Sequence, residues 1–163
     1  MPDINTFEWG LHLPTLRALR LTLRTLSEAD VADVLAVFSD PLVLRYWDGP
    51  LMTTQQEAMQ YIERIHYGFR RRELLQWGIA DTTTSAVIGT CTLTHLSATH
   101  ERAEIGFAIK QTRWGQGLGS EAASAVIDFA FGDMGLHRIE ADVDPRNDRS
   151  LRLLERLGFT REG

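Results

Sequence analysis

The sequence has a single cysteine, Cys91, among its 163 residues. One cysteine excludes an internal disulfide framework and a multi-cysteine zinc site, and it is typical of a reducing compartment. No apolar run approaches the roughly 20 residues that cross a bilayer. The first ten residues carry Asp3 and Glu8 and lack the basic and apolar stretches of a signal peptide. These absences predict a cytoplasmic protein with no membrane partner, and we expect Cys91 in the core.

Positive charge is also scarce, because 17 lysines and arginines stand against 22 aspartates and glutamates, which gives a net charge of −5. Lys110 is the only lysine. An acidic balance argues against nucleic acid as the main partner. The five histidines do not show the spacing of metal ligands, so we expect no metal site.

The length of the chain predicts one domain that buries roughly two-thirds of its unfolded surface. No internal repeat, low-complexity segment or linker divides the sequence. We therefore expect a single domain over residues 1–163, with an N-terminal extension at 1–18 and a core at 19–163. Whether this domain forms a homodimer is left open by the sequence.

Leucines at alternate positions from 19 to 23 predict a half-buried strand. A helix then begins near Ser27, and a second runs from Thr53 or Thr54 to the arginines at 70–72. Further strands are expected at 75–80, 86–96, 102–109 and 137–143, and further helices at 118–134 and 148–157. Meander strands mixed with crossover helices predict an α/β (α+β layered) domain with a mixed central sheet flanked by helices.

A glycine-rich turn between the strand at 102–109 and the helix at 118–134 is the most informative segment. Gly115, Gly117 and Gly119 occupy alternate positions, so that several backbone N–H groups can point at one place. The helix that begins here adds its free N–H groups and its positive dipole end. Such a turn suits a pyrophosphate. Arg113 either adds a charged contact to that group or is a surface arginine with no specific role, and the sequence leaves both open.

Two other phosphate-binding motifs fit this turn less well. A Walker loop needs a Gly-Lys-Ser/Thr end, and no lysine follows the glycines. Gly115, Gly117 and Ser120 nearly match a dinucleotide fingerprint, with Glu140 about 20 residues further on. However, that motif places its first glycine tightly after the strand and requires further βαβ units, which the remaining chain does not provide.

Three stretches together resemble the GNAT superfamily of acyl-CoA-dependent N-acetyltransferases: Ala-Glu-Ile-Gly-Phe-Ala-Ile at 103–109, the turn at 114–119, and residues 147–159 from Asn147 to Phe159. The turn matches the superfamily pattern except at its first position, where Trp114 replaces glutamine or arginine. Within this superfamily, the sequence is similar to the subgroup of RimJ/RimL ribosomal-protein N-terminal acetyltransferases. The similarity lies at Trp114, Ser150, Arg45-Tyr46-Trp47 and the ending at 156–163. The resemblance implies the GNAT fold, which usually continues into one or two more strands after a segment like 158–163. We therefore expect a sheet that lacks its last strand or strands.

The resemblance implies acetyl-CoA as the co-substrate and no metal. The turn amides would hold the pyrophosphate, the strand end would pair with the pantetheine arm, Asn147 would bind that arm, and Ser150 would lie near the thioester sulfur. Taken alone, Asn147 is also typical of a helix cap and Ser150 of an ordinary first-turn serine. The candidate cofactor-binding residues are Phe107, Ile109, Arg113, Gly115, Gln116, Gly117, Leu118, Gly119, Ser120, Asn147 and Ser150.

The implied chemistry is transfer of an acetyl group to a primary amine, which requires a base, an oxyanion donor and a protonated leaving thiol. Glu104 lies where several superfamily members carry the base, although a glutamate in a strand is also commonly a solvated or paired side chain. A backbone N–H near Ile109 is expected to stabilise the oxyanion. Many members carry a tyrosine acid at the position of Leu154, so Ser150 is the remaining candidate, with Glu162 as a second carboxylate.

The acceptor is expected to be a protein N-terminus or a small-molecule amine, bound by Arg45, Tyr46 and Trp47 among others. Two alternatives remain for the function of the chain. One is a binding module that keeps the fold and the CoA site without turnover, and the other is a nucleotide- or NAD-binding domain.

Overall fold

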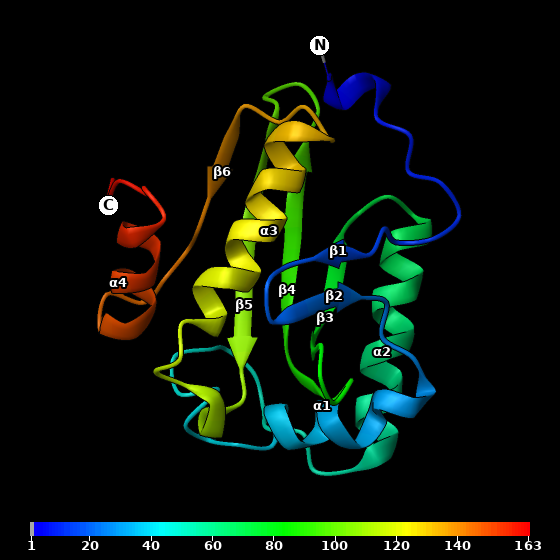
Figure 1. The fold of residues 1–163 in the computed structure, drawn as a ribbon, viewed down its shortest axis with the longest axis vertical. Helices are drawn as coiled ribbons and strands as arrows, with labels where there is room; N and C mark the ends of the chain where they lie inside the picture. The colour runs from blue at the N-terminus through cyan, green and yellow to red at the C-terminus, as the bar shows by residue number, and fades with distance from the viewer. Residues whose placement is uncertain (1) are drawn as a thin grey trace.

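The computed structural model describes residues 2–163 (Figure 1). These residues form one six-stranded sheet with helices packed against it. The strands are β1 (Leu16–Arg17), β2 (Leu21–Arg24), β3 (Leu75–Asp81), β4 (Val87–Ser97), β5 (Arg102–Ile109) and β6 (Arg138–Glu140). The α-helices are α1 (Val31–Phe38), α2 (Gln55–Arg70), α3 (Leu118–Gly132) and α4 (Asp148–Arg156). Short 3-10 helices lie at Ile4–Thr6, Glu28–Asp30 and Gln111–Arg113.

The strands follow one another across the sheet in chain order, from β1 to β6. All neighbours are antiparallel except β5 and β6, which run parallel. A parallel pair needs a crossover connection, and α3 supplies it. The predicted class, a mixed central sheet flanked by helices, is confirmed.

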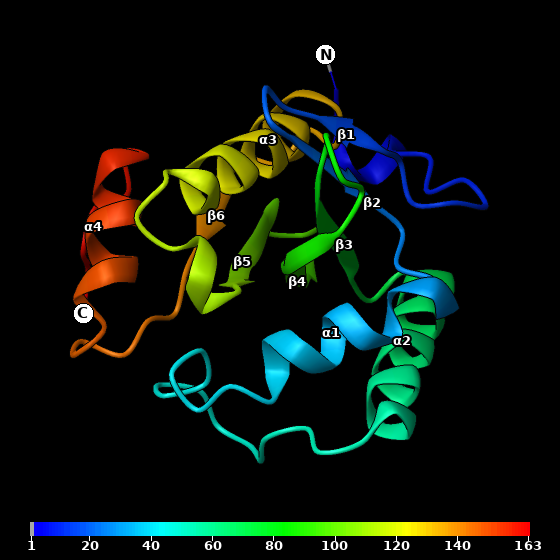
Figure 2. The same ribbon diagram turned by 60° about the horizontal axis from the view of Figure 1, so that its bottom comes forward.

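Helices cover both faces of the sheet, so the domain has two apolar cores (Figure 2). The larger core lies under α3 and includes Trp77, Cys91 and Ile105. The smaller core lies under α1 and α2 and includes Ala108. Successive side chains of a strand point to opposite faces, and β5 follows this rule. Its even-numbered residues, Glu104 among them, therefore lie on the face of the sheet that α1 and α2 cover.

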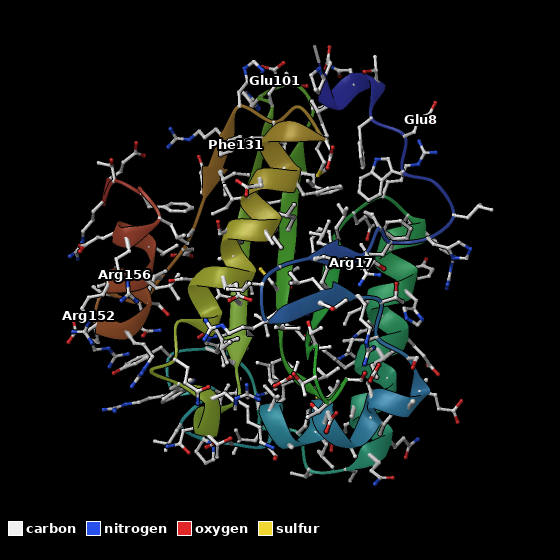
Figure 3. All side chains as sticks on the ribbon, in the orientation of Figure 1. Glu8, Arg17, Glu101, Phe131, Arg152 and Arg156 are labelled. Atoms are coloured by element: carbon white, nitrogen blue, oxygen red, sulfur yellow. The ribbon has the colours of Figure 1, made fainter. Side chains whose placement is uncertain are left out.

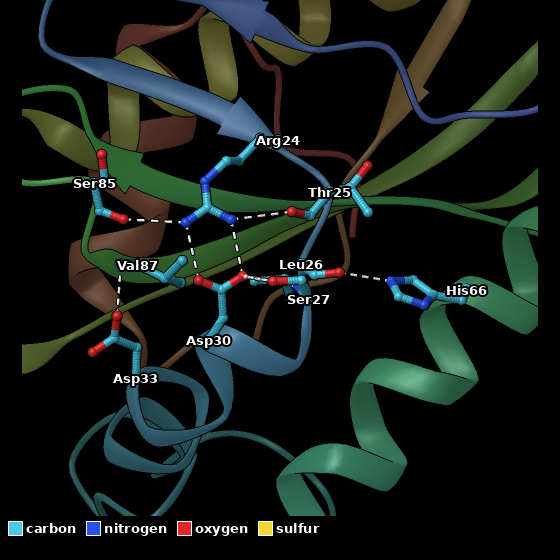
Figure 4. A network of polar contacts seen from close by, with 9 residues as sticks. All are labelled: Arg24, Thr25, Leu26, Ser27, Asp30, Asp33, His66, Ser85 and Val87. Atoms are coloured by element: carbon cyan, nitrogen blue, oxygen red, sulfur yellow. Dashed lines mark hydrogen bonds and ion pairs between the residues drawn. The ribbon is translucent and has the colours of Figure 1, made fainter.

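A polar network fixes the start of α1 against the sheet (Figure 4). Asp30 is 4% exposed, accepts the N–H of Ser27 at 2.8 Å and binds the Arg24 guanidinium through two 2.9 Å hydrogen bonds. Burial alone would raise the pKa of Asp30, but the hydrogen bonds from Arg24 and Ser27 outweigh it and lower this pKa. The buried carboxylate therefore keeps its charge and holds α1 to β2.

Two predicted strands differ from the structure at their ends. The strand predicted to begin at Leu19 begins at Leu21, because Leu19, which is 90% exposed, lies in the bend between β1 and β2. The strand predicted over 137–143 is limited to Arg138–Glu140, because the chain leaves β5 after the pair Glu104–Glu140. The segment expected to be an extension also contributes a strand, β1.

The region after α4 contains no strand among the described residues, and β6 is the last strand of the sheet. A groove of about 970 Å³ lies here, bounded by β6, α3, α4 and residues 157–163. Leu154, which stands where the resemblance would place a tyrosine, lines this groove. None of the helices in residues 2–163 has the length and apolar character needed to cross a membrane.

Candidate active site

A cavity of about 530 Å³ lies where four segments meet: the loop after α1, the end of β5, the turn before α3, and α4 with the loop that precedes it. Most of the site residues predicted from the sequence line this cavity: Arg45, Tyr46, Trp47, Phe107, Ile109, Arg113, Gly115, Gly117, Leu118, Gly119, Ser120, Asn147 and Ser150. Gln116 and Glu104 are not among the residues that line it.

The turn before α3 has the backbone conformation that the glycine pattern predicts. Gly115 and Gly117 both have φ of +76°, in the left-handed region that favours glycine. Gly117 caps α3, and the first backbone bond of the helix runs from the N–H of Glu121 to the carbonyl of Gly117. The N–H groups of the residues between them have no partner inside the helix. Leu118, Gly119 and Ser120 line the cavity, and free N–H groups at a helix N-terminus are a favourable site for an anionic group.

A long-range ion pair holds this turn from behind. Arg20 Nε lies 2.8 Å from Glu121 Oε1, and Arg20 Nη1 donates to the carbonyl of Gln116 at 2.9 Å. Gln116 thus supports the turn through its backbone, outside the cavity. No sequence signal pointed to Arg20 or Glu121, because the pair joins residues 101 positions apart.

Arg113 is anchored from another side of the turn. Its Nη2 lies 3.0 Å from Asp81 Oδ2, at the end of β3. A backbone hydrogen bond from Thr83, together with the contact to Arg113, lowers the pKa of Asp81. Arg113 still lines the cavity, so one guanidinium both braces the turn and adds positive charge beside it.

The two parallel strands separate beside the cavity. β6 pairs with β5 only over the three registers from Arg102 to Glu104, whereas β5 continues to Ile109. The edge of β5 beyond Glu104 therefore has no strand partner on that side within the described chain. An extended ligand can add to such an edge by backbone hydrogen bonds. The carbonyl of Ile109 is already used, because the indole Nε1 of Trp114 donates to it at 2.8 Å.

The first turn of α4 forms the opposite wall. Asn147 caps this helix, and its side-chain oxygen accepts the N–H of Ser150 at 3.2 Å. Its amide nitrogen takes no part in that bond and remains available as a donor. Asn147 therefore has the helix-capping role that the sequence offered as one alternative. Asn147 and Ser150 also line the cavity.

Two loops meet at the Tyr46 ring. Arg45 lies over this ring at 5.2 Å and Arg146 at 5.5 Å, both measured from the guanidinium carbon to the ring centre. Side-chain and backbone hydrogen bonds from Arg146 lower the pKa of Asp144 to about 2, so Asp144 stays charged. The ring thus joins the loop after α1 to the loop before α4. Trp47, 44% exposed, stands next to it.

Glu104 lies on β5, outside the cavity lining. One of its carboxylate oxygens lies 3.0 Å from His95 Nδ1, and its side chain is 33% exposed. Glu104, Gly106 and Ala108 share one face of the strand, and Ala108 lines the cavity. Gly106 between them is exposed, and a Cβ added at this glycine would have no other atom within 4 Å. About 13 Å of strand separates the carboxylate from the cavity, and the exposed backbone at Gly106 forms an open strip along it.

The remaining reactive groups lie away from this cavity. Cys91 is fully buried, and burial raises the pKa of its thiol to about 12, which confirms the prediction of a core residue. Within residues 2–163, no group of three or more histidine, cysteine, aspartate or glutamate side chains is placed to hold a metal ion.

Comparison with known proteins adds to this geometry. The family described as "Acetyltransferase (GNAT) domain" matches residues 20–160. The chain belongs to the GNAT acetyltransferase family. The GNAT chain is 38% identical to the uncharacterized N-acetyltransferase p20 of Bacillus licheniformis, over 93% of its own length and 85% of that protein.

Solved structures show the same fold. A GNAT-family acetyltransferase of Bacillus anthracis has a TM-score of 0.82 and 25% identity, covering 92% of this chain and 86% of that one. RimJ of Mycobacterium smegmatis, in complex with CoA-disulfide, has a TM-score of 0.81 and 24% identity over 93% and 78% of the two chains. With the family match and the relative named an N-acetyltransferase, this GNAT chain is an acyltransferase enzyme.

Proposed function

We propose that this enzyme transfers the acetyl group of acetyl-CoA to a primary amine in the cavity beside β5. The observation that carries the proposal is the shared cavity. The first residues of α3, the end of β5 beyond its pairing with β6, and Asn147 all line it. The two left-handed glycines leave the turn without side chains that would block close approach of a phosphate. These residues fit the pyrophosphate and the pantetheine arm of the co-substrate.

In this proposal Glu104 acts as the base. It takes a proton from the ammonium of the acceptor, directly or through water in the open strip over Gly106. The amine nitrogen then forms a bond to the acetyl carbon and the thioester C–S bond breaks. The nitrogen gives up its second proton to become the amide, and the leaving thiolate takes up one proton and departs as CoA. The Ser150 hydroxyl is assigned to orient the leaving sulfur or to protonate the thiolate. Leu154 has no group for that role.

The acceptor is proposed to contact the loop of Arg45, Tyr46 and Trp47. The spermidine N(1)-acetyltransferase of Escherichia coli is 26% identical over 93% of this chain and 77% of that protein, so small amines are one candidate class. Protein N-termini are the other, in keeping with the sequence similarity to the RimJ/RimL subgroup. The single, buried Cys91 is consistent with a cytoplasmic enzyme.

The test is an acceptor screen with detection of released thiol and of the acetylated product by mass. The screen contains N-terminal peptides of ribosomal proteins, spermidine and aminoglycosides, each with acetyl-CoA. Release of CoA with formation of an N-acetyl product supports the proposal. Calorimetric binding of acetyl-CoA without product from any amine class would favour the module that lacks turnover, and binding of NAD(H) in place of acetyl-CoA would refute the proposal.

A further inference from the structure

Arginine dominates the charged residues of the cavity, although the protein as a whole is acidic. Six arginines line the cavity, whereas Asp148 is the only carboxylate that does so. Two of the six are paired elsewhere, Arg113 with Asp81 and Arg146 with Asp144. The other four arginines of the cavity carry the positive charge that no carboxylate pairs with among the described residues.

Three of the others lie on one face of a single helix. Arg149, Arg152 and Arg156 occupy positions i, i+3 and i+7 of α4, which places them side by side along the helix surface. Arg152 and Arg156 are seen on the outer helix α4 in Figure 3. Within the described part of the chain, none of the three forms a salt bridge or a side-chain hydrogen bond, and all three line the cavity. Like charges at this spacing repel one another, and an anion bound between them would relieve that repulsion.

One of these arginines is held in place by the phosphate-binding turn itself. The Arg149 guanidinium carbon lies 4.3 Å from the ring centre of Trp114. The indole is fixed in turn by its hydrogen bond to the carbonyl of Ile109. Stacking uses the flat face of a guanidinium and leaves its N–H edges free for an oxyanion. Trp114 therefore presents Arg149 at the mouth of the turn with its donors unused.

We propose that Arg149, Arg152 and Arg156 hold the 3′-phosphate of the acyl-CoA, and that Trp114 is a positioning residue for Arg149. This inference rests on the proposed use of acetyl-CoA. CoA carries a phosphate monoester on its ribose besides the pyrophosphate, and such a group has a charge close to −2 at neutral pH. The turn amides and Arg113 serve the pyrophosphate. The arginine row of α4 lies next to that turn, on the outer side of the cavity, and supplies the second anion site.

The consequence is selectivity for CoA over 3′-dephospho-CoA, which differs from CoA only in this phosphate. The experiment is titration calorimetry of the intact protein with each compound, which needs no acceptor and no turnover. We expect the wild type to bind CoA at least roughly tenfold more tightly. Arg149→Gln, Arg152→Gln and Arg156→Gln are each expected to weaken CoA binding several-fold and to leave dephospho-CoA binding unchanged. A matched control is Arg17→Gln, an exposed arginine of β1 far from α4 (Figure 3).

The role of Trp114 is tested by the ratio of the two affinities. Trp114→Leu removes the ring and is expected to lower the ratio as Arg149→Gln does, whereas Trp114→Phe keeps a ring and restores most of it. The double variant is expected to lose no more selectivity than Arg149→Gln alone, because both changes remove the same contact. If Trp114→Leu weakens the binding of CoA and of dephospho-CoA by the same factor, the ratio of the two affinities does not change. That result would show a purely structural role for the indole and overturn the assignment of Trp114 as a positioning residue.

The outcomes separate the two proposals. A wild type that binds CoA and dephospho-CoA with equal affinity overturns the 3′-phosphate site and leaves the proposed function standing. A wild type that binds neither compound refutes the proposed use of acetyl-CoA. If the α4 variants weaken both compounds alike, the arginines serve the pyrophosphate and the assignment is wrong.

Discussion

The Nδ1 atom of His95 lies 3.0 Å from a carboxylate oxygen of Glu104, across the antiparallel strands β4 and β5. The pair stands at the far end of the open strip that leads over Gly106 to the cavity. A cross-strand pairing of Glu104, one of the two alternatives that the sequence offered, is thus present, and it places the carboxylate beside an imidazole.

Glu104→Gln is expected to lower acetyl transfer by on the order of 10²- to 10⁴-fold, because an amide cannot take the ammonium proton. The measurement is the rate of thiol release against pH with an acceptor identified in the screen. Glu101→Gln is the matched control, since Glu101 also pairs with a histidine, His137, at 3.3 Å. Equal rates for the Glu104 variant and the wild type across the pH range would remove Glu104 from the mechanism.

Gly89→Ala is expected to destabilise the protein by about 3 kcal/mol, since a Cβ at this position would lie 2.0 Å from the backbone oxygen of Ala108. Backbone in a central strand pair cannot move aside as a side chain can, so β5 would shift at the cavity. Urea unfolding measures the cost. Gly106→Ala, on the paired strand and with open space around it, is expected to fold as stably as the wild type. A Gly89→Ala protein of unchanged stability would contradict the close strand approach.

Asp30→Asn is expected to lower the free energy of unfolding at neutral pH by about 1 to 3 kcal/mol, because Arg24 loses its charged partner. The pKa of Asp30 in the folded state lies below its ordinary value of 3.8. Its contribution is therefore fully present above that value and is lost as the pH falls through the folded pKa. Unfolding curves from pH 7 downward should show a constant difference between wild type and variant above pH 3.8 and a narrowing difference below it. Asp128→Asn, at an exposed site on α3, should match the wild type throughout.

Cys91 is expected to resist thiol reagents while the protein is folded, because it is fully buried and its pKa is raised to about 12. Incubation with a disulfide reagent that reports free thiol should give no signal until denaturant is added, and then one equivalent per chain. A fast signal from the folded protein would show that β4 opens locally. The same result decides whether thiol release in the acceptor screen can be read without correction.

Local sequence signals determined the elements that carry the site. The alternating glycines predicted a tight turn, which the structure forms with left-handed Gly115 and Gly117, and the start of α3 at Leu118 was also predicted. Both depend on the conformation of a few neighbouring residues. The limits of β5 and the capping role of Asn147 were predictable for the same reason. The mixed sheet followed from the order of these elements, and the family from three motifs in that order.

Only the tertiary structure decided which distant residues meet. The packing of the turn and α3 against the sheet brings Arg20 to Glu121 behind the turn and Asp81 to Arg113 beside it. No local sequence pattern predicts either pair. Likewise, the arginines of α4 are an ordinary polar helix face in the sequence. The position of Arg149 over Trp114 depends on how α4 packs after the parallel strands separate. The sequence by itself determined the turn, the helices and the family, because these depend on short-range conformation. The charge of the cavity and the distance from Glu104 to it were decided by long-range packing.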